Sequence, residues 1–191
     1  MKSDTSVIVI ACSTGGPNVL REIVSGLDER LQVPIVIVQH MSAVFTKSLA
    51  KSLNRLSKIH IEEAKNGEIL QNGRVYIAPG GKHIKIMKNL SGDSFFKVYD
   101  GSGNLKPCAD ILLKSLISTS YSNVTVIVLT GMGKDGTAGI LLLKQSGKQV
   151  FVIAQKPEEC IVSGMSKSVI ELGLEDKILP AEEIAQAMMK G

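Results

Sequence analysis

The sequence predicts an α/β protein, with three layers (α/β/α) around a mainly parallel, doubly wound sheet. Runs of β-branched residues, such as 7–10 and 124–129, have the near-continuous apolar character of strands that are buried on both faces. Segments with apolar residues at helical spacing separate these runs, as in residues 18–27. A chain of 191 residues suits one hydrophobic core, so we expect a single domain that covers residues 1–191.

The first third of the chain alternates strands with helices. After the strand at 7–10, Gly15 and Gly16 allow a tight reversal, and Pro17 fits the first turn of the helix that follows. We expect the next elements to be a strand at 34–41, a helix at 46–56 and a short strand at 59–64.

The middle of the chain changes character. Residues 74–79, 83–88 and 94–99 are short runs separated by turn residues, and the last two alternate apolar and polar residues as a β-hairpin does. We interpret this region as an insertion or an antiparallel edge of the sheet. The alternation then resumes, with helices at 109–120, 137–146, 163–172 and 181–189 and strands at 124–129 and 149–154. This order predicts a Rossmann-like sheet.

Composition excludes several classes of protein. Hydrophobic residues make up 44% and charged residues 21%, as in soluble globular proteins, and no run is long enough for a membrane span or a signal peptide. The three cysteines form no CxxC pair, so we expect neither disulfides nor a zinc site, and we expect a cytoplasmic setting. A net charge of +4 and 4% aromatic residues do not favour nucleic-acid binding.

Three polar residues follow predicted strands directly. Ser13 follows the first strand, His40 ends the second, and Asp135 lies in the loop after residues 124–129. Sites in such sheets lie at the carboxyl ends of the strands. A serine, a histidine and an aspartate at one edge predict a nucleophile, a base and a group that orients the base.

Each of these residues also has a simpler interpretation. Ser13 or Thr14 can cap the helix that follows, or the turn can bind an anion on its backbone N–H groups. His40 can be an ordinary strand-end histidine, and Asp135 precedes Gly136 as turn residues often do.

A second motif competes for the same loop. Residues 131–136 fit the pattern G-x-G-x-x-G between a strand and a helix, which is the setting of a dinucleotide-binding fold. The acidic residue that such folds place at the end of the next strand is absent, and Asp135 would repel a pyrophosphate. A dinucleotide-binding or non-catalytic α/β module that uses the loop Gly131–Gly136 stays the alternative.

Six stretches resemble the catalytic domain of the CheB family, the chemotaxis protein-glutamate methylesterases. They are residues 11–17 (ACSTGGP), 39–46 (QHMSAVFT), 75–80 (VYIAPG), 110–115 (DILLKS), 129–136 (LTGMGKDG) and 154–165 (AQKPEECIVSGM). Together they span nearly the whole chain. One departure is Ala11-Cys12, where family members usually have glycine and alanine.

The resemblance implies a serine hydrolase that demethylates glutamate γ-methyl esters on methyl-accepting chemotaxis receptors and also deamidates glutamine. It implies Ser13 as nucleophile, His40 as base and Asp135 as orienter, with the backbone N–H of Met132 in the oxyanion hole. A second oxyanion donor near Thr14 is our geometric inference. No metal or organic cofactor is expected, and a serine hydrolase that acts on another ester stays a further alternative.

Typical members of this family also carry a receiver domain, which these residues do not encode. We therefore expect either an excised catalytic domain or a member of a single-domain subgroup. Phosphorylation control within the chain is not expected, and a separate response-regulator protein is the expected regulatory partner.

Overall fold

The computed structural model describes residues 6–190, which form a parallel sheet between helices and a small separate hairpin. Within these residues the strands are β1 (Ser6–Cys12), β2 (Ile35–Gln39), β3 (His60–Glu63), β4 (Arg74–Ile77), β5 (His83–Lys88), β6 (Ser94–Tyr99), β7 (Asn123–Val128), β8 (Gln149–Gln155) and β9 (Lys177–Leu179). The helices are α1 (Gly16–Ser25), α2 (Ala43–Asn54), α3 (Ala109–Leu116), α4 (Thr137–Gln145), α5 (Gly164–Glu171) and α6 (Ala181–Lys190), with a 3₁₀ turn η1 (Pro157–Glu159).

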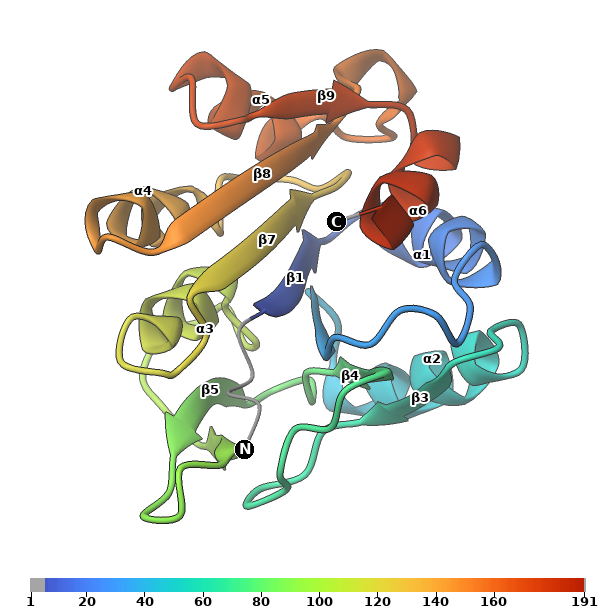
Figure 1. Cartoon of the computed structure of the whole chain (residues 1–191). Helices are drawn as coiled ribbons and strands as arrows, with labels where there is room; N and C mark the ends of the chain where they lie inside the picture. The colour runs from blue at the N-terminus through green and yellow to red at the C-terminus, as the bar shows by residue number, and fades with distance from the viewer. Residues whose placement is uncertain (1–5, 191) are drawn as a thin grey trace.

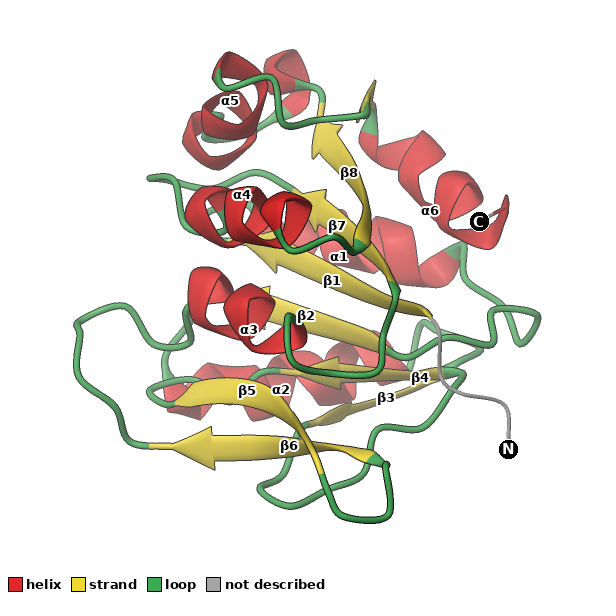
Figure 2. Cartoon of the chain, turned by 60° about the vertical axis from the view of Figure 1, so that its left-hand side comes forward, coloured by secondary structure: helices red, strands yellow, loops and turns green. Residues whose placement is uncertain are grey.

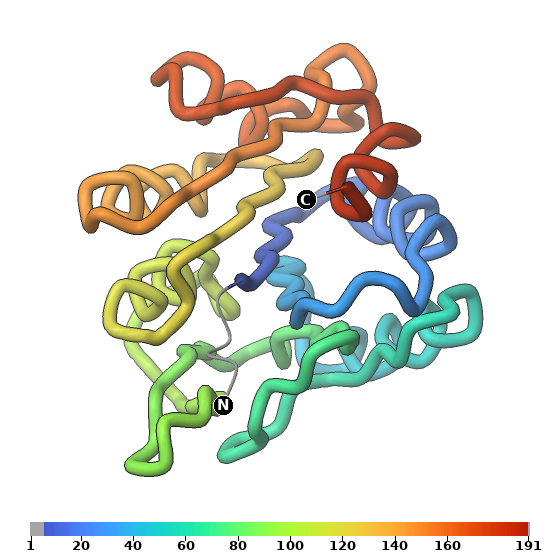
Figure 3. The backbone as a smooth tube through the Cα atoms, in the orientation of Figure 1, coloured from blue at the N-terminus to red at the C-terminus, as the bar shows by residue number. Residues whose placement is uncertain are grey.

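The sheet is doubly wound around β1, as the sequence predicts. Its strand order is β3-β4-β2-β1-β7-β8-β9, and every neighbouring pair is parallel. The chain starts in the centre, moves outward through β2, and later crosses back to β7 on the other side of β1 (Figures 1 and 3). The connections therefore diverge at the carboxyl end of β1, where open α/β sheets form their binding crevice.

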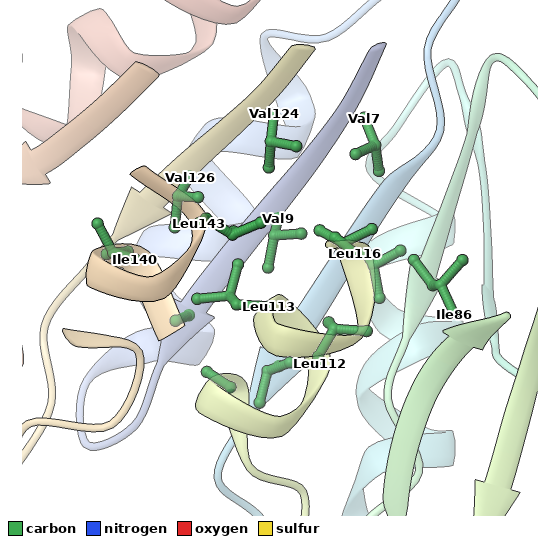
Figure 4. Packing of buried hydrophobic residues seen from close by; sticks show 14 of the residues in the cluster. Val7, Val9, Ile86, Leu112, Leu113, Leu116, Val124, Val126, Ile140 and Leu143 are labelled. Atoms are coloured by element: carbon green, nitrogen blue, oxygen red, sulfur yellow. The ribbon is translucent and has the colours of Figure 1, made fainter. Parts of the chain in front are cut away.

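Alternate residues of β1 face two different cores. Val7, Val9 and Ala11 belong to the apolar cluster beneath α3, α4 and α5, whereas Ile8 and Ile10 belong to the cluster beneath α1, α2 and α6. Figure 2 shows these two helical layers on opposite faces of the sheet. Figure 4 shows the first cluster, in which side chains of β1 and β7 meet those of α3 and α4. The first strand is buried on both faces, as predicted.

The hairpin is not an edge of the main sheet. Strands β5 and β6 pair antiparallel with each other as a two-stranded sheet of their own, whereas β4 is a parallel strand of the main sheet. Ile84, Ile86 and Phe96 bury their side chains in the cluster that also contains α3. The predicted antiparallel hairpin is thus confirmed, and it adds to one helical layer as an insertion; only the alternative of an antiparallel edge of the main sheet is wrong.

Two short elements were not predicted. The strand β9 has three residues and lies among charged residues, and η1 contains two adjacent glutamates, so neither has a usable hydrophobic period. None of the helices formed by residues 6–190 has the length and apolar character that crossing a membrane requires.

Candidate active site

Ser13 and His40 lie side by side at the carboxyl ends of neighbouring strands. The last register pair of β1 and β2 is Cys12 with Gln39, so the next residue of each strand is Ser13 and His40. The backbone N–H of His40 donates to the carbonyl of Cys12 at 3.0 Å, which continues the ladder by one step. Neighbouring strands lie about 4.8 Å apart, which sets the separation of the two backbones.

The turn after β1 is shaped by its glycines. Gly15 is the N-cap of α1 with φ of 87°, and no side chain caps this helix. The hydroxyl groups of Ser13 and Thr14 therefore do not serve as its cap, which removes that simpler interpretation. Gly131 lies against the serine, since a Cβ at Gly131 would lie 2.8 Å from Cβ of Ser13. The loop after β7 therefore packs directly against the turn that carries Ser13.

A buried glutamine ties the two strand ends together. Gln39 is 1% exposed, and its Nε2 donates to the carbonyls of Ser13 at 2.9 Å and His40 at 3.2 Å. Its Oε1 accepts from the thiol of Cys12 at 3.1 Å, and burial raises the pKa of that thiol well above its ordinary range. A Cβ at Gly16 would lie 2.1 Å from this Oε1, so any larger residue there would displace the amide. One amide thus fixes the backbone of both residues.

His40 and Asp135 are in direct contact, although 95 residues separate them in sequence. Nε2 of His40 lies 2.7 Å from Oδ2 of Asp135, and the two side chains are 9% and 5% exposed. The structure therefore brings together two of the three predicted side chains. An isolated strand-end histidine and an ordinary turn aspartate do not account for a buried pair at this distance.

Asp135 is surrounded by hydrogen-bond donors. Oδ2 also accepts from the N–H of Ala109 at 2.7 Å, and Oδ1 accepts from the N–H of Asp110 at 3.0 Å and from the thiol of Cys108 at 3.1 Å. Burial raises the pKa of Asp135, but the hydrogen bonds from His40 and the two N–H groups outweigh it and lower the pKa to about 2.

The ionisation of Asp135 determines which nitrogen of the His40 ring carries a proton. An ionised carboxylate only accepts hydrogen bonds, so Nε2 of His40 carries the proton that lies between them. In the neutral imidazole the lone pair is then on Nδ1. The geometry therefore offers Nδ1 of His40 as the basic nitrogen at this edge of the sheet.

Two backbone N–H groups of these loops have no acceptor among the described residues: that of Thr14, which follows Ser13, and that of Met132, which follows Gly131. Within residues 6–190, the N–H groups of Thr14 and Met132 donate no hydrogen bond, and the Ser13 hydroxyl makes none either. The Met132 side chain is 74% exposed. Free donors beside a hydroxyl are what an oxyanion hole requires.

Cys108, Asp110 and Asp135 form the one group among the described residues whose ligand atoms lie close enough together to suggest a metal, within 4.8 Å. The acceptor positions on these carboxylates are already directed at N–H donors. Burial raises the pKa of the Cys108 thiol to about 12, so the thiol keeps its proton. A cation would have to break these hydrogen bonds, and we assign no metal to this cluster.

The structure also argues against dinucleotide binding at residues 131–136. In a dinucleotide fold the pyrophosphate takes the free N–H groups at the helix N-terminus. Here Oδ1 of Asp110 already accepts from the N–H groups of Gly136 and Gly139, at 2.9 and 2.7 Å. Gly164 of α5 packs on the loop, where a Cβ would lie 3.1 Å from the nitrogen of Gly133.

Several residues of this site were not singled out from the sequence. Asp110 and Cys108 contact Asp135 from 25 and 27 positions away, and no local pattern reports such a contact. The sequence does give an indication for Gln39, since a polar amide next to the histidine is unusual at the end of an otherwise apolar strand. Thr130 contributes through its hydroxyl, which donates to the carbonyl of Thr14 at 2.9 Å.

Comparison with known proteins gives consistent results. Residues 8–188 match the family model described as CheB methylesterase. A protein-glutamate methylesterase/protein-glutamine glutaminase of Bacillus subtilis is 44% identical over 95% of this chain and 51% of its own length. A protein of the same name from Desulfotalea psychrophila is 40% identical over 98% of this chain and 52% of its length. The chain thus spans about half the length of these curated relatives.

A solved structure matches over almost its whole length. The crystal structure of the Thermotoga maritima CheB methylesterase catalytic domain superposes with a TM-score of 0.91 at 40% sequence identity. The match covers 97% of this chain and 98% of that one.

Proposed function

Because the chain belongs to the CheB methylesterase family, we propose that residues 1–191 are a single catalytic domain that hydrolyses glutamate γ-methyl esters in proteins. We extend the proposal to the deamidation of glutamine, since the relatives carry both activities in their names. The observation that supports it most strongly is the buried contact of His40 with Asp135, with His40 at the strand end next to that of Ser13.

In the first half of the reaction, Ser13 Oγ attacks the γ-carbonyl carbon of the ester. Nδ1 of His40 takes the hydroxyl proton as the new C–O bond forms, and the charge of Asp135 stabilises the resulting imidazolium through Nε2. The tetrahedral intermediate then collapses. Its C–O bond to the methoxy group breaks, methanol leaves with the proton from His40, and an ester of Ser13 remains.

In the second half, water attacks the same carbon while His40 accepts a proton from it. The bond to Ser13 Oγ breaks, the serine recovers its proton from His40, and the glutamate side chain is released as the acid, which loses its proton to solvent to become the carboxylate. Glutamine follows the same steps with ammonia as the leaving group. Both tetrahedral intermediates carry a negative oxygen, and we propose the free N–H groups of Met132 and Thr14 as its donors.

The substrate protein that we propose is a methyl-accepting chemotaxis receptor, modified on its cytoplasmic helices. The three cysteines are free in the structure, which fits a reducing compartment. A response-regulator protein is the regulatory partner that we propose, and adding its phosphorylated form to the assay tests this part separately.

The test compares Ser13→Ala and His40→Ala with the unmodified chain on a methyl-esterified receptor cytoplasmic fragment, with released methanol measured by gas chromatography. Each variant is expected to lower kcat on the order of 10⁶-fold, because the residues act as a unit. Ser118→Ala is the matched control, since this serine is exposed at the end of α3. Normal methanol release by Ser13→Ala would refute the proposed mechanism.

A fluorophosphonate probe separates the remaining alternatives. Covalent labelling of Ser13, with no methanol released from the receptor fragment, would assign the chain to hydrolysis of another ester. Absence of both labelling and methanol release would favour the non-catalytic module.

A further inference from the structure

Two aspartates of the site cap each other's helices. The carboxylate of Asp135, which lies just before α4, accepts from the N–H groups of Ala109 and Asp110 at the start of α3. The carboxylate of Asp110, within the first turn of α3, accepts from the N–H groups of Gly136 and Gly139 at the start of α4. The two helix starts are therefore joined by four hydrogen bonds in a closed, reciprocal arrangement.

Neither helix has a capping side chain of its own. The N-cap residues are Cys108 for α3 and Gly136 for α4, and neither makes a side-chain cap hydrogen bond. The first N–H groups of a helix have no partner within the helix. Here the aspartate of the other helix supplies that partner, so the starts of α3 and α4 depend on each other.

The close approach of the two helices is built into the sequence. A Cβ at Gly139 would lie 2.7 Å from Cβ of Leu113 and 3.1 Å from Cα of Asp110. Glycine at this position lets α4 lie directly against α3, which brings the carboxylate of Asp110 within reach of both backbone N–H groups.

We propose that Asp110 is a positioning residue for the active site: it holds the carboxylate of Asp135 in line with the ring of His40. This inference rests on the proposed function. Asp110 holds Asp135 through two hydrogen bonds. Its backbone N–H donates to Oδ1 of Asp135, and its carboxylate accepts from the backbone N–H of Gly136, the residue that follows Asp135. Rotation of Asp135 away from His40 must break one of these contacts.

The arrangement places two carboxylates close together, which is electrostatically unfavourable. Burial raises the pKa of Asp110, and the negative charge of Asp135 raises it further, against the hydrogen bonds from Gly139 and Gly136. The positive ends of the two helices offset part of this repulsion. An apolar residue at 110 would avoid the repulsion, but it would leave the start of α4 without its cap.

The test uses Asp110→Ala and Asp110→Asn, assayed by methanol release from the receptor fragment and by the rate of fluorophosphonate labelling of Ser13. Asp110→Ala removes the acceptor and is expected to lower kcat by about 10- to 100-fold with KM within twofold, because small misplacements of catalytic groups have effects of this size. Asp110→Asn keeps an oxygen at the position of Oδ1 and should stay within about threefold of the unmodified chain.

A double variant shows whether Asp110 acts through Asp135. If it does, adding Asp110→Ala to Asp135→Ala causes no further loss of kcat. Additive losses, an unchanged kcat in Asp110→Ala, or an equal loss in Asp110→Asn and Asp110→Ala would each overturn the inference. If Asp110→Ala does not fold, Asp110→Ser replaces it, since the serine hydroxyl is one bond shorter than the carboxylate, reaches the two N–H groups less well and should give an intermediate loss.

Asp176→Ala is the matched control for a purely structural carboxylate. Oδ2 of Asp176 accepts from the N–H of Val152 at 2.7 Å and pairs with Lys144, so its loss disturbs the fold without touching Asp135. It should lower the melting temperature and leave kcat unchanged. Failure of the proposed function and failure of this inference about Asp110 give different results. A chain without the proposed function releases no methanol before any substitution is made.

Discussion

Replacement of Asp135 by asparagine should cost stability as well as activity. The carboxylate accepts hydrogen bonds from four donors, two on each oxygen. An asparagine offers one accepting oxygen and one NH₂ group, which is itself a donor. Whichever way the amide turns, its NH₂ faces donors, and at least one buried N–H at the start of α3 loses its partner.

The structure gives the magnitude of the effect. Asp135 has a pKa of about 2 in the fold, compared with an ordinary value of 3.8. At 1.36 kcal/mol per pKa unit, ionisation of this group stabilises the fold by roughly 2 kcal/mol at neutral pH. An unsatisfied buried donor adds about 1–3 kcal/mol. Together these two contributions predict that Asp135→Asn lowers the free energy of unfolding by about 3–5 kcal/mol at pH 7.

The effect has a defined pH dependence. Because the pKa is lower in the fold than in the unfolded chain, the contribution is complete above pH 3.8 and is lost as the pH falls from 3.8 toward 2. Asparagine does not titrate, so the gap between the two proteins should narrow by about 1 kcal/mol between pH 7 and pH 3.

Urea denaturation followed by far-UV circular dichroism at both pH values measures these differences. Asp176→Asn is the control, since this carboxylate is 36% exposed and pairs with a lysine near the surface, so it should contribute less than about 1 kcal/mol. Equal stability of Asp135→Asn and the unmodified chain at pH 7, or a gap that stays constant down to pH 3, would refute the reasoning.

Three further predictions follow from the surroundings of the site. Gly16→Ala should lower the free energy of unfolding by about 1–3 kcal/mol in urea, because its Cβ would displace the amide of Gln39, and a fully stable variant would contradict this packing. Gln39→Glu removes the side-chain N–H group that donates to the carbonyls of both Ser13 and His40, so both stability and the rate of Ser13 labelling should fall, and an unchanged labelling rate would count against the role of this amide. Burial raises the pKa of Cys108 to about 12 and of Cys160 to about 11. Iodoacetamide at pH 8 should therefore modify both thiols more slowly in the native than in the urea-unfolded protein, as measured by peptide mass spectrometry. Equal rates in the two states would contradict the burial of these thiols.

The fold could be predicted where the hydrophobic pattern is long and regular. Residues 7–10 lie in β1 and residues 124–128 in the adjacent strand β7, because only a fully buried strand tolerates such runs. The place of the hairpin could not be predicted. Its alternation shows that one face is buried, but that face can pack on a helix or extend a sheet, and here it packs against α3.

The site could be predicted only as far as the edge of the sheet. Strand ends place Ser13, His40 and Asp135 at one rim, and the contact between His40 and Asp135 confirms that two of them meet. Their catalytic roles stay predictions. The contacts made by Asp110 and Gln39 depend on how α3, α4 and the first two strands pack, and a local sequence pattern carries no information on that packing.

The tip of the β5–β6 hairpin separates the chain into two parts that carry different residues of the candidate site. Its tip, around the fully exposed Leu90, contributes nothing to the parallel sheet. Ser13 and His40 precede this tip, whereas Asp135 follows it. The polypeptide could therefore be opened there into two complementing fragments, and the proposed activity would return only when the fragment with Ser13 and His40 and the fragment with Asp135 reassemble across β1 and β7.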